Sequence, residues 1–135
     1  MRTYPIRVDA FVSSTFVTLI QNLIDGLEDG DDSRAAVEYE IGEEDLLDLE
    51  SSLMLTVPTP DLNFALLTER TAHLNKKQVD CMLGECEVKI EDVESNIEYL
   101  KREGKDLAID RKYLADLQAF HEVLETHAAN AELGR

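Results

Sequence analysis

The sequence has few cysteines and few basic residues, and each shortage excludes a class of protein. Only two cysteines, Cys81 and Cys86, occur in 135 residues, too few for the disulfide framework of a small secreted domain. Residues five apart on a helix point about 140° away from each other, so these two thiols are not expected to pair. Lysine and arginine number 13, against 29 aspartates and glutamates. Direct binding to nucleic acid or to an anionic membrane needs clustered positive charge, so neither partner is expected.

Long apolar runs are also missing. The longest apolar stretch, from Phe11 to Leu27, is interrupted by Ser, Thr, Gln, Asn and Asp residues, and it falls short of the ~18 residues that span a bilayer. The N-terminus lacks the order of charged, apolar and small residues that marks a signal peptide. We therefore expect a cytoplasmic protein with reduced cysteines.

Motifs for catalysis or cofactor binding are absent too. The sequence contains no Gly-rich phosphate loop and no Ser nucleophile elbow. Cys86 and His121 would supply only two ligands, which do not hold a structural zinc ion. Asp29, Asp31 and Asp32 could gather calcium, but the twelve-residue loop with its terminal Glu is lacking. We expect a protein that is not an enzyme and that carries neither a cofactor nor a metal.

A helical pattern of mostly apolar residues runs from Val79 to Ala131 and is broken once, at Gly104. The spacing of three or four predicts two helices that fold back on each other and bury one face each. The stripe consists of Val79, Met82, Cys86, Ile90, Val93, Ile97 and Leu100, then Leu107, Leu114, Leu117, His121, Leu124, Ala128 and Ala131. In register, Val93 would face Leu114, and Cys86 would lie near His121.

The N-terminal part begins with a strand pattern followed by a helix pattern. Apolar residues alternate over residues 4–8, which predicts a short strand at a sheet edge because Pro5 cannot donate to a ladder. Residues 16–27 then place their apolar side chains on one helical face. Three residues are suitable caps for this helix: Asp9, Ser13 and Ser14.

The middle of the chain predicts two more strands. Alternation over residues 35–41 is the clearest strand pattern, and residues 53–57 form a third, stopped by Pro58. Between them, Glu43 to Ser51 could be a short acidic helix or a broad connection. From Asp61 the pattern predicts helix to the end of the chain, with a break over the polar residues 73–78.

These elements predict an α+β fold that is predominantly helical. A small N-terminal strand-helix-strand-strand unit (residues 1–60) is followed by a long antiparallel helical hairpin (residues 61–135), within a single domain spanning residues 1–135. A two-helix hairpin alone buries too little surface to be stable. Its stripe must therefore close on the N-terminal unit or on another chain, and a homodimer through the hairpin is one such arrangement.

The acidic excess is concentrated in the first sixty residues. They carry thirteen acidic and three basic residues, so they hold −10 of the net charge of −16. A dense negative field can steer a basic partner protein, although solubility or adaptation to high salt would produce the same composition. The residues we predict to bind a partner are Glu28, Asp29, Asp31, Asp32, Glu38, Glu40, Glu43, Glu44, Asp45 and Asp48.

Two functional hypotheses follow from this composition. The first is a non-enzymatic inhibitor or adaptor that engages a basic groove on another protein. Since many basic grooves belong to nucleic-acid-binding proteins, a DNA mimic directed at a complex such as a host defence nuclease fits this description. The alternative is a structural or assembly subunit, of a virion or another complex, that associates through coiled-coil-like helix packing.

Overall fold

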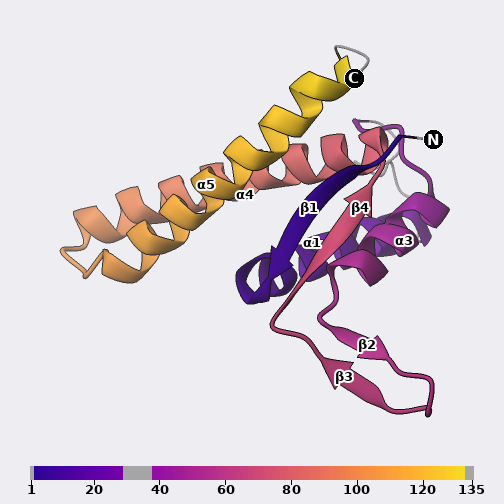
Figure 1. Ribbon diagram of the computed structural model, residues 1–135. Helices are drawn as coiled ribbons and strands as arrows, with labels where there is room; N and C mark the ends of the chain where they lie inside the picture. The colour runs from indigo at the N-terminus through magenta and orange to yellow at the C-terminus, as the bar shows by residue number, and fades with distance from the viewer. Residues whose placement is uncertain (1, 29–37, 133–135) are drawn as a thin grey trace. The chain divides into compact units, whose positions relative to one another are not determined.

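The computed structural model describes residues 2–28 and 38–132 (Figure 1). The chain divides into two compact units, residues 1–81 and residues 82–135. The order of elements confirms the α+β, predominantly helical fold: a strand and a helix come first, further strands follow, and a long helical hairpin ends the chain.

A two-stranded antiparallel sheet forms one layer of the first unit. Strand β1 (Tyr4–Asp9) pairs with β4 (Glu69–Leu74), with Tyr4 opposite Leu74 and Ile6 opposite Ala72. These four side chains are buried, and the alternate residues are mostly exposed. The predicted strand over residues 4–8 is therefore confirmed, and its alternation reflects one buried and one exposed face.

Two helices cover the buried face of this sheet. Helix α1 (Ala10–Glu28) contacts β1, helix α3 (Glu43–Leu53) contacts β4, and the two helices contact each other. Asp9 caps α1, because its Oδ1 accepts a hydrogen bond from the Val12 backbone N–H at 3.0 Å. The short acidic helix was one of two interpretations of residues 43–51, and α3 confirms it.

The segment Ala10–Leu27 of α1 is long and apolar enough to cross a membrane by length and composition alone, the one such helix in the described ranges. The expectation that this stretch falls short of a membrane span is therefore wrong by length and composition. The core helix of a globular unit and a signal sequence near the N-terminus both have such a composition. Helix α1 packs against α3 and buries Phe16 and Ile20, so its apolar face has a role in packing. The expectation of a cytoplasmic protein without a membrane partner stays a prediction.

The predicted strand over residues 35–41 is wrong where the structure describes it. Residues 35–37 lie outside the described residues, and residues 38–41 form a turn and irregular backbone, with Glu40 at φ 52°. Ile41 is buried, so part of the alternation reflects burial. A strand also needs a partner to pair with, and in the described part of the chain no strand pairs with this segment.

The helix predicted from Asp61 is also wrong over residues 61–72, the stretch before the predicted break at residues 73–78. Strand β2 (Thr56–Pro58) pairs with β3 (Phe64–Leu66) in an antiparallel hairpin, and β4 follows directly. The Thr59 backbone N–H donates to the Asn63 carbonyl at 2.9 Å and closes the turn. The strand predicted over residues 53–57 is shifted, since Leu53 is the last residue of α3.

A reciprocal cap starts helix α4 (Lys76–Arg102). The Gln78 backbone N–H donates to Asn75 Oδ1, and the Asn75 backbone N–H donates to Gln78 Oε1, both at 2.9 Å. This is the geometry of a capping box. Gln78 also donates from Nε2 to the Asp45 carbonyl at 2.9 Å, which ties the start of α4 to α3 within the first unit.

The helical hairpin is confirmed by α4 and α5 (Ala108–Glu132), which run antiparallel through the second unit (Figure 1). Helix α4 ends where the sequence predicted, because Gly104 takes a left-handed φ of +67°. The backbone N–H of Gly104 bonds to the Lys101 carbonyl at 3.2 Å, and that of Lys105 bonds to the Leu100 carbonyl at 3.0 Å. This pair of bonds is the Schellman motif, which favours glycine at this position.

Two contacts between the helices agree with the predicted register of the hairpin to within one residue, and a third, from Cys86, falls on Leu117 instead of His121, one turn away. The Cys86 thiol donates to the Leu117 carbonyl at 3.5 Å, and His121 Nε2 lies 3.1 Å from Glu87 Oε1. Towards the tip, Asn96 Nδ2 donates to Asp110 Oδ1 at 3.2 Å. His121 thus contacts Glu87, which is one residue along the chain from its predicted neighbour, Cys86.

Candidate protein-binding surfaces

Helix α3 brings four of the predicted partner-binding acids together. Glu43, Glu44 and Asp45 form its first turn, and Asp48 follows one turn later. Carboxylates are stabilised at a helix N-terminus because the macrodipole is positive there. This local stabilisation explains why an acidic sequence can begin a helix after Gly42, whose N-cap position offers no side-chain hydrogen bond.

Three of these carboxylates are available to a partner. Glu43, Glu44 and Asp48 are exposed, and within the described ranges their side chains make no hydrogen bond or ion pair. Asp45 differs, because it is half-buried and its Oδ1 accepts a hydrogen bond from Asn75 Nδ2 at 3.2 Å. Asp45 therefore has a packing role that the sequence did not indicate.

The other predicted acids lie before α3. Glu38 and Glu40 are exposed in the irregular segment that leads to it. Asp29, Asp31 and Asp32 lie outside the described residues, as does the side chain of Glu28, which ends α1. The structure thus assembles the α3 acids and leaves the grouping of all ten as a prediction.

A second acidic surface, which the sequence analysis missed, runs along α4 in the second unit. Glu87, Glu91, Glu94 and Glu98 are all exposed, and their spacing of four, three and four places them on one helix face over about 16 Å. Glu87 contacts His121, whereas the other three have no hydrogen bond or ion pair in the part of the chain that is described. The periodicity that revealed the apolar stripe could have revealed this acidic row.

A polar pocket of about 390 Å³ in the first unit combines residue types found in hydrolases. Asp48, Ser51, Ser52 and His73 contribute to its lining. A nucleophile needs a base within hydrogen-bond reach, and the base needs an orienting group. Among the residues described, no hydrogen bond joins His73 to Asp48 or to either serine, so the pocket does not hold an assembled triad.

The chemistry of Cys86 is set by burial. Desolvation, with a smaller contribution from the charge of Glu87, raises the pKa of the Cys86 thiol to about 12. Metal ligation and nucleophilic attack both require the thiolate, so this side chain acts as a small apolar group that donates to Leu117. Over the described ranges, no three His, Cys, Asp or Glu residues are grouped as metal ligands would be.

In comparisons with known proteins, no family model, no curated protein and no solved structure matches this chain.

Proposed function

We propose that this protein is a non-enzymatic inhibitor or adaptor whose acidic surfaces engage a basic groove on another protein. The observation that carries the proposal is the set of exposed carboxylates on α3 and α4 without partners in the described part of the chain. If these acids served only to form ion pairs within the chain, each would lie next to a lysine, arginine or histidine side chain. Here three acids of α3 and three of α4 are left to interact with solvent or with another molecule: Glu43, Glu44, Asp48, Glu91, Glu94 and Glu98.

Electrostatics makes a basic groove the natural partner. Both units are negative, with net charges of −10 for residues 1–81 and −6 for residues 82–135. Fields of one sign raise the association rate with an oppositely charged surface, and this effect weakens as salt increases. Binding through these surfaces should therefore be fast and salt-dependent.

The row on α4 favours the DNA-mimic form of this proposal. Its four carboxylates are spread over about 16 Å, or about one negative charge per 5.5 Å. One strand of B-DNA carries a phosphate per 3.4 Å, so the row has about two-thirds of that linear density. A groove built to follow a phosphate backbone, such as that of a host defence nuclease, presents the complementary row of cations.

A displacement assay with matched charge reversals tests the proposal. A panel of nucleases and other DNA-binding proteins is loaded with a fluorescent duplex, and release of the duplex is followed by anisotropy at 50 and 200 mM salt. The variants are Glu44→Lys/Asp48→Lys on α3 and Glu91→Lys/Glu94→Lys on α4. The control, Glu122→Lys/Glu125→Lys on α5, changes the net charge by the same amount at exposed positions.

We expect the unmodified chain to displace DNA from a subset of the panel, and more weakly at 200 mM salt. At least one of the first two variants should weaken displacement about tenfold or more, while the control stays within about twofold. Failure to displace DNA from any member would reject the DNA-mimic form. Equal weakening by all three variants would show that only total charge matters and would reject the two surfaces as binding sites.

The alternative, an assembly subunit that associates through helix packing, is favoured by apolar side chains near the hairpin tip. Ile109 is 84% exposed and Tyr99 is 52% exposed. This form predicts self-association that is insensitive to salt and lost in Ile109→Asp, as measured by light scattering coupled to size exclusion. A chain that stays monomeric at high concentration would reject it.

A further inference from the structure

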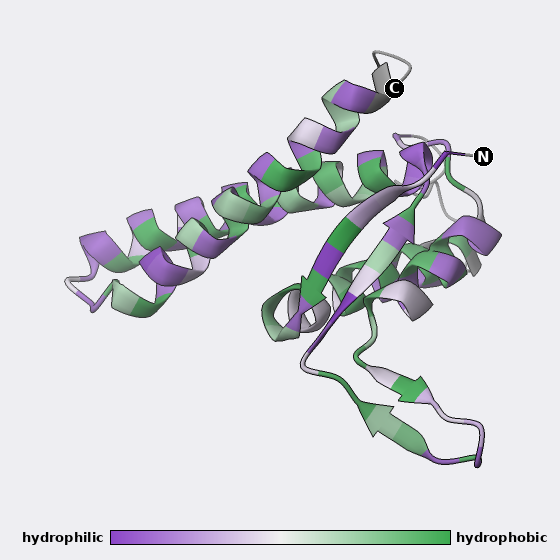
Figure 2. Ribbon diagram, in the orientation of Figure 1, coloured by the Kyte–Doolittle hydropathy of each residue, from purple (hydrophilic) through white to green (hydrophobic). Residues whose placement is uncertain are grey.

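The β2–β3 hairpin is an uncharged region in a highly charged chain. Charged residues make up 31% of the sequence, yet residues 54–67, which we call the β-arm, contain only Asp61. Figure 2 shows apolar colouring along β3 and over part of β2. Three of its apolar side chains face solvent: Leu62 is 94% exposed, Phe64 is 71% exposed and Leu66 is 81% exposed.

The exposed side chains lie on one face of β3 and in the turn before it. Phe64 and Leu66 alternate within β3, so they point to the same side, and Leu62 lies in the turn that precedes the strand. The pairing places Pro58 opposite Phe64, which extends this apolar face onto β2. A two-stranded hairpin is marginally stable by itself in water, so a covered apolar face would stabilise it.

The turn of the β-arm is held in a defined shape. The Thr59 hydroxyl donates to the Asp61 carboxylate and lies 2.9 Å from the Asn63 carbonyl oxygen, which shares its proton, and Asn63 Nδ2 donates to the same carboxylate at 3.2 Å. Leu62 follows at φ 65°, a left-handed conformation that favours Gly or Asn. A large apolar side chain is thus presented at a position where a small or polar residue would be easier to accommodate.

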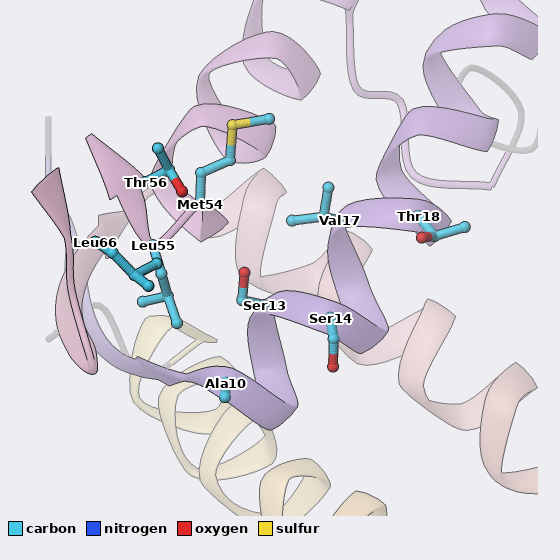
Figure 3. Close-up of a pocket in the computed structure, with 9 residues that line it drawn as sticks. All are labelled: Ala10, Ser13, Ser14, Val17, Thr18, Met54, Leu55, Thr56 and Leu66. Atoms are coloured by element: carbon cyan, nitrogen blue, oxygen red, sulfur yellow. The ribbon is translucent and has the colours of Figure 1, made fainter. Parts of the chain in front are cut away.

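The same unit contains an uncharged groove next to the base of the β-arm. The groove has a volume of about 410 Å³ and lies between α1 and the arm, with Val17 on one side and Leu55 and Leu66 on the other (Figure 3). Its nine lining residues include no charged side chain. Leu66 belongs both to this groove and to the exposed face of the arm, so the two apolar surfaces are continuous.

We propose that the β-arm docks on a second copy of this chain, with Phe64 and Leu62 entering the uncharged groove of the partner. A projecting apolar face and a groove on the same unit allow a two-fold arrangement in which each copy fills the other. Two molecules that each carry −16 can come together most easily through surfaces without charge. The arm projects away from its own groove, because the pairing of Thr56 with Leu66 sets the base of the arm at the groove and places Leu62 in the turn at the opposite end.

This inference does not rest on the proposed function, since the β-arm contains none of the acids assigned there. The test is sedimentation equilibrium of the full chain from 1 to 500 µM at 0.5 M salt, where repulsion between copies is screened. The variants are Phe64→Asp and Leu62→Asp. The matched control is Ile109→Asp, which alters an equally exposed apolar residue in the other unit.

We expect a monomer–dimer equilibrium that Ile109→Asp leaves unchanged. Phe64→Asp should weaken it by about a hundredfold or more, because each dimer loses two buried phenyl rings. A chain that is monomeric at 500 µM would overturn the proposal, and so would a dimer that is lost in Ile109→Asp but kept in both arm variants. Circular dichroism should show the same helix content for all variants, since the three side chains are exposed.

A cross-link identifies the groove as the docking site. Differently tagged chains carrying Pro60→Cys, in the turn of the arm, and Ser13→Cys, in the groove, are mixed and oxidised, so that Phe64 and Leu62 are kept while the native cysteines stay buried. A disulfide between the two tagged chains supports insertion of the arm into the groove. A dimer that forms without this cross-link would place the arm elsewhere and overturn the proposed site.

Discussion

The substitution Gln78→Ala should destabilise the first unit by about 2 kcal/mol. Gln78 is 5% exposed and makes two side-chain hydrogen bonds, accepting from the Asn75 N–H and donating to the Asp45 carbonyl, both at 2.9 Å. Removing one partner of a buried hydrogen bond costs about 1–3 kcal/mol. Because both remaining groups are only partly buried and the Asp45 carbonyl is also placed to accept within α3, about 1 kcal/mol each is the appropriate value. For a chain of this length, the melting temperature should fall by about 6–8 °C.

Urea unfolding followed by far-ultraviolet circular dichroism measures this loss, with Lys77→Ala as the control. Lys77 lies in the same helical turn, is exposed and makes no hydrogen bond or ion pair among the described residues, so its removal should change stability by less than about 0.5 kcal/mol. Asn75→Ala/Gln78→Ala should cost less than the sum of its single substitutions, because both side chains belong to one reciprocal cap. A loss below 0.5 kcal/mol for Gln78→Ala, or strict additivity of the pair, would refute this account of the cap.

Three further predictions concern single residues. Leu62→Asn should raise stability by about 0.5–1 kcal/mol in thermal melts because Asn tolerates a positive φ; an unchanged melting temperature would mean that the turn is not strained. Cys86 should resist iodoacetamide at pH 8 in the folded protein and react in urea; rapid labelling of the folded chain would contradict this. The free energy of unfolding should also fall as pH rises from 9 towards 12, since the folded thiol has the higher pKa. Hydrogen bonds from Thr59 and Asn63 lower the pKa of Asp61 below its ordinary value of 3.8. Its carboxyl should therefore titrate late in an acid NMR series, and the turn should weaken as pH falls. Thr59→Val should raise the pKa of Asp61, and an unchanged pKa would exclude the hydroxyl as the cause of the shift.

Helices with long, regular apolar spacing were predictable from the sequence. The hairpin register followed from matching two stripes about Gly104, and the contacts of Asn96 with Asp110 and of Glu87 with His121 agree with it. The reason is physical: a helix forms its hydrogen bonds within one segment, so its sequence contains most of the information about it.

Strands were less predictable because their partners lie elsewhere in the chain. Residues 61–74 contain leucines at spacings that suit a helix, yet β4 pairs with β1, 60 to 70 residues earlier. Residues 38–41 alternate like a strand but remain irregular, because alternation indicates which side chains are buried without supplying a partner. Short apolar runs of this kind suit both helix and strand until long-range pairing selects one.

The candidate surfaces divide in the same way. Composition alone predicted an acidic protein without a metal site or cofactor and named the acids of α3, but burial distinguished Glu44, which is exposed, from Asp45, which bonds to Asn75. The sequence by itself determined the charge, the helical hairpin and its turn, because these depend on composition and on contacts close in the chain. Only the tertiary structure decided the pairing of β1 with β4, the exposed face of the β-arm and the uncharged groove beside it, because each depends on which distant segments bury one another.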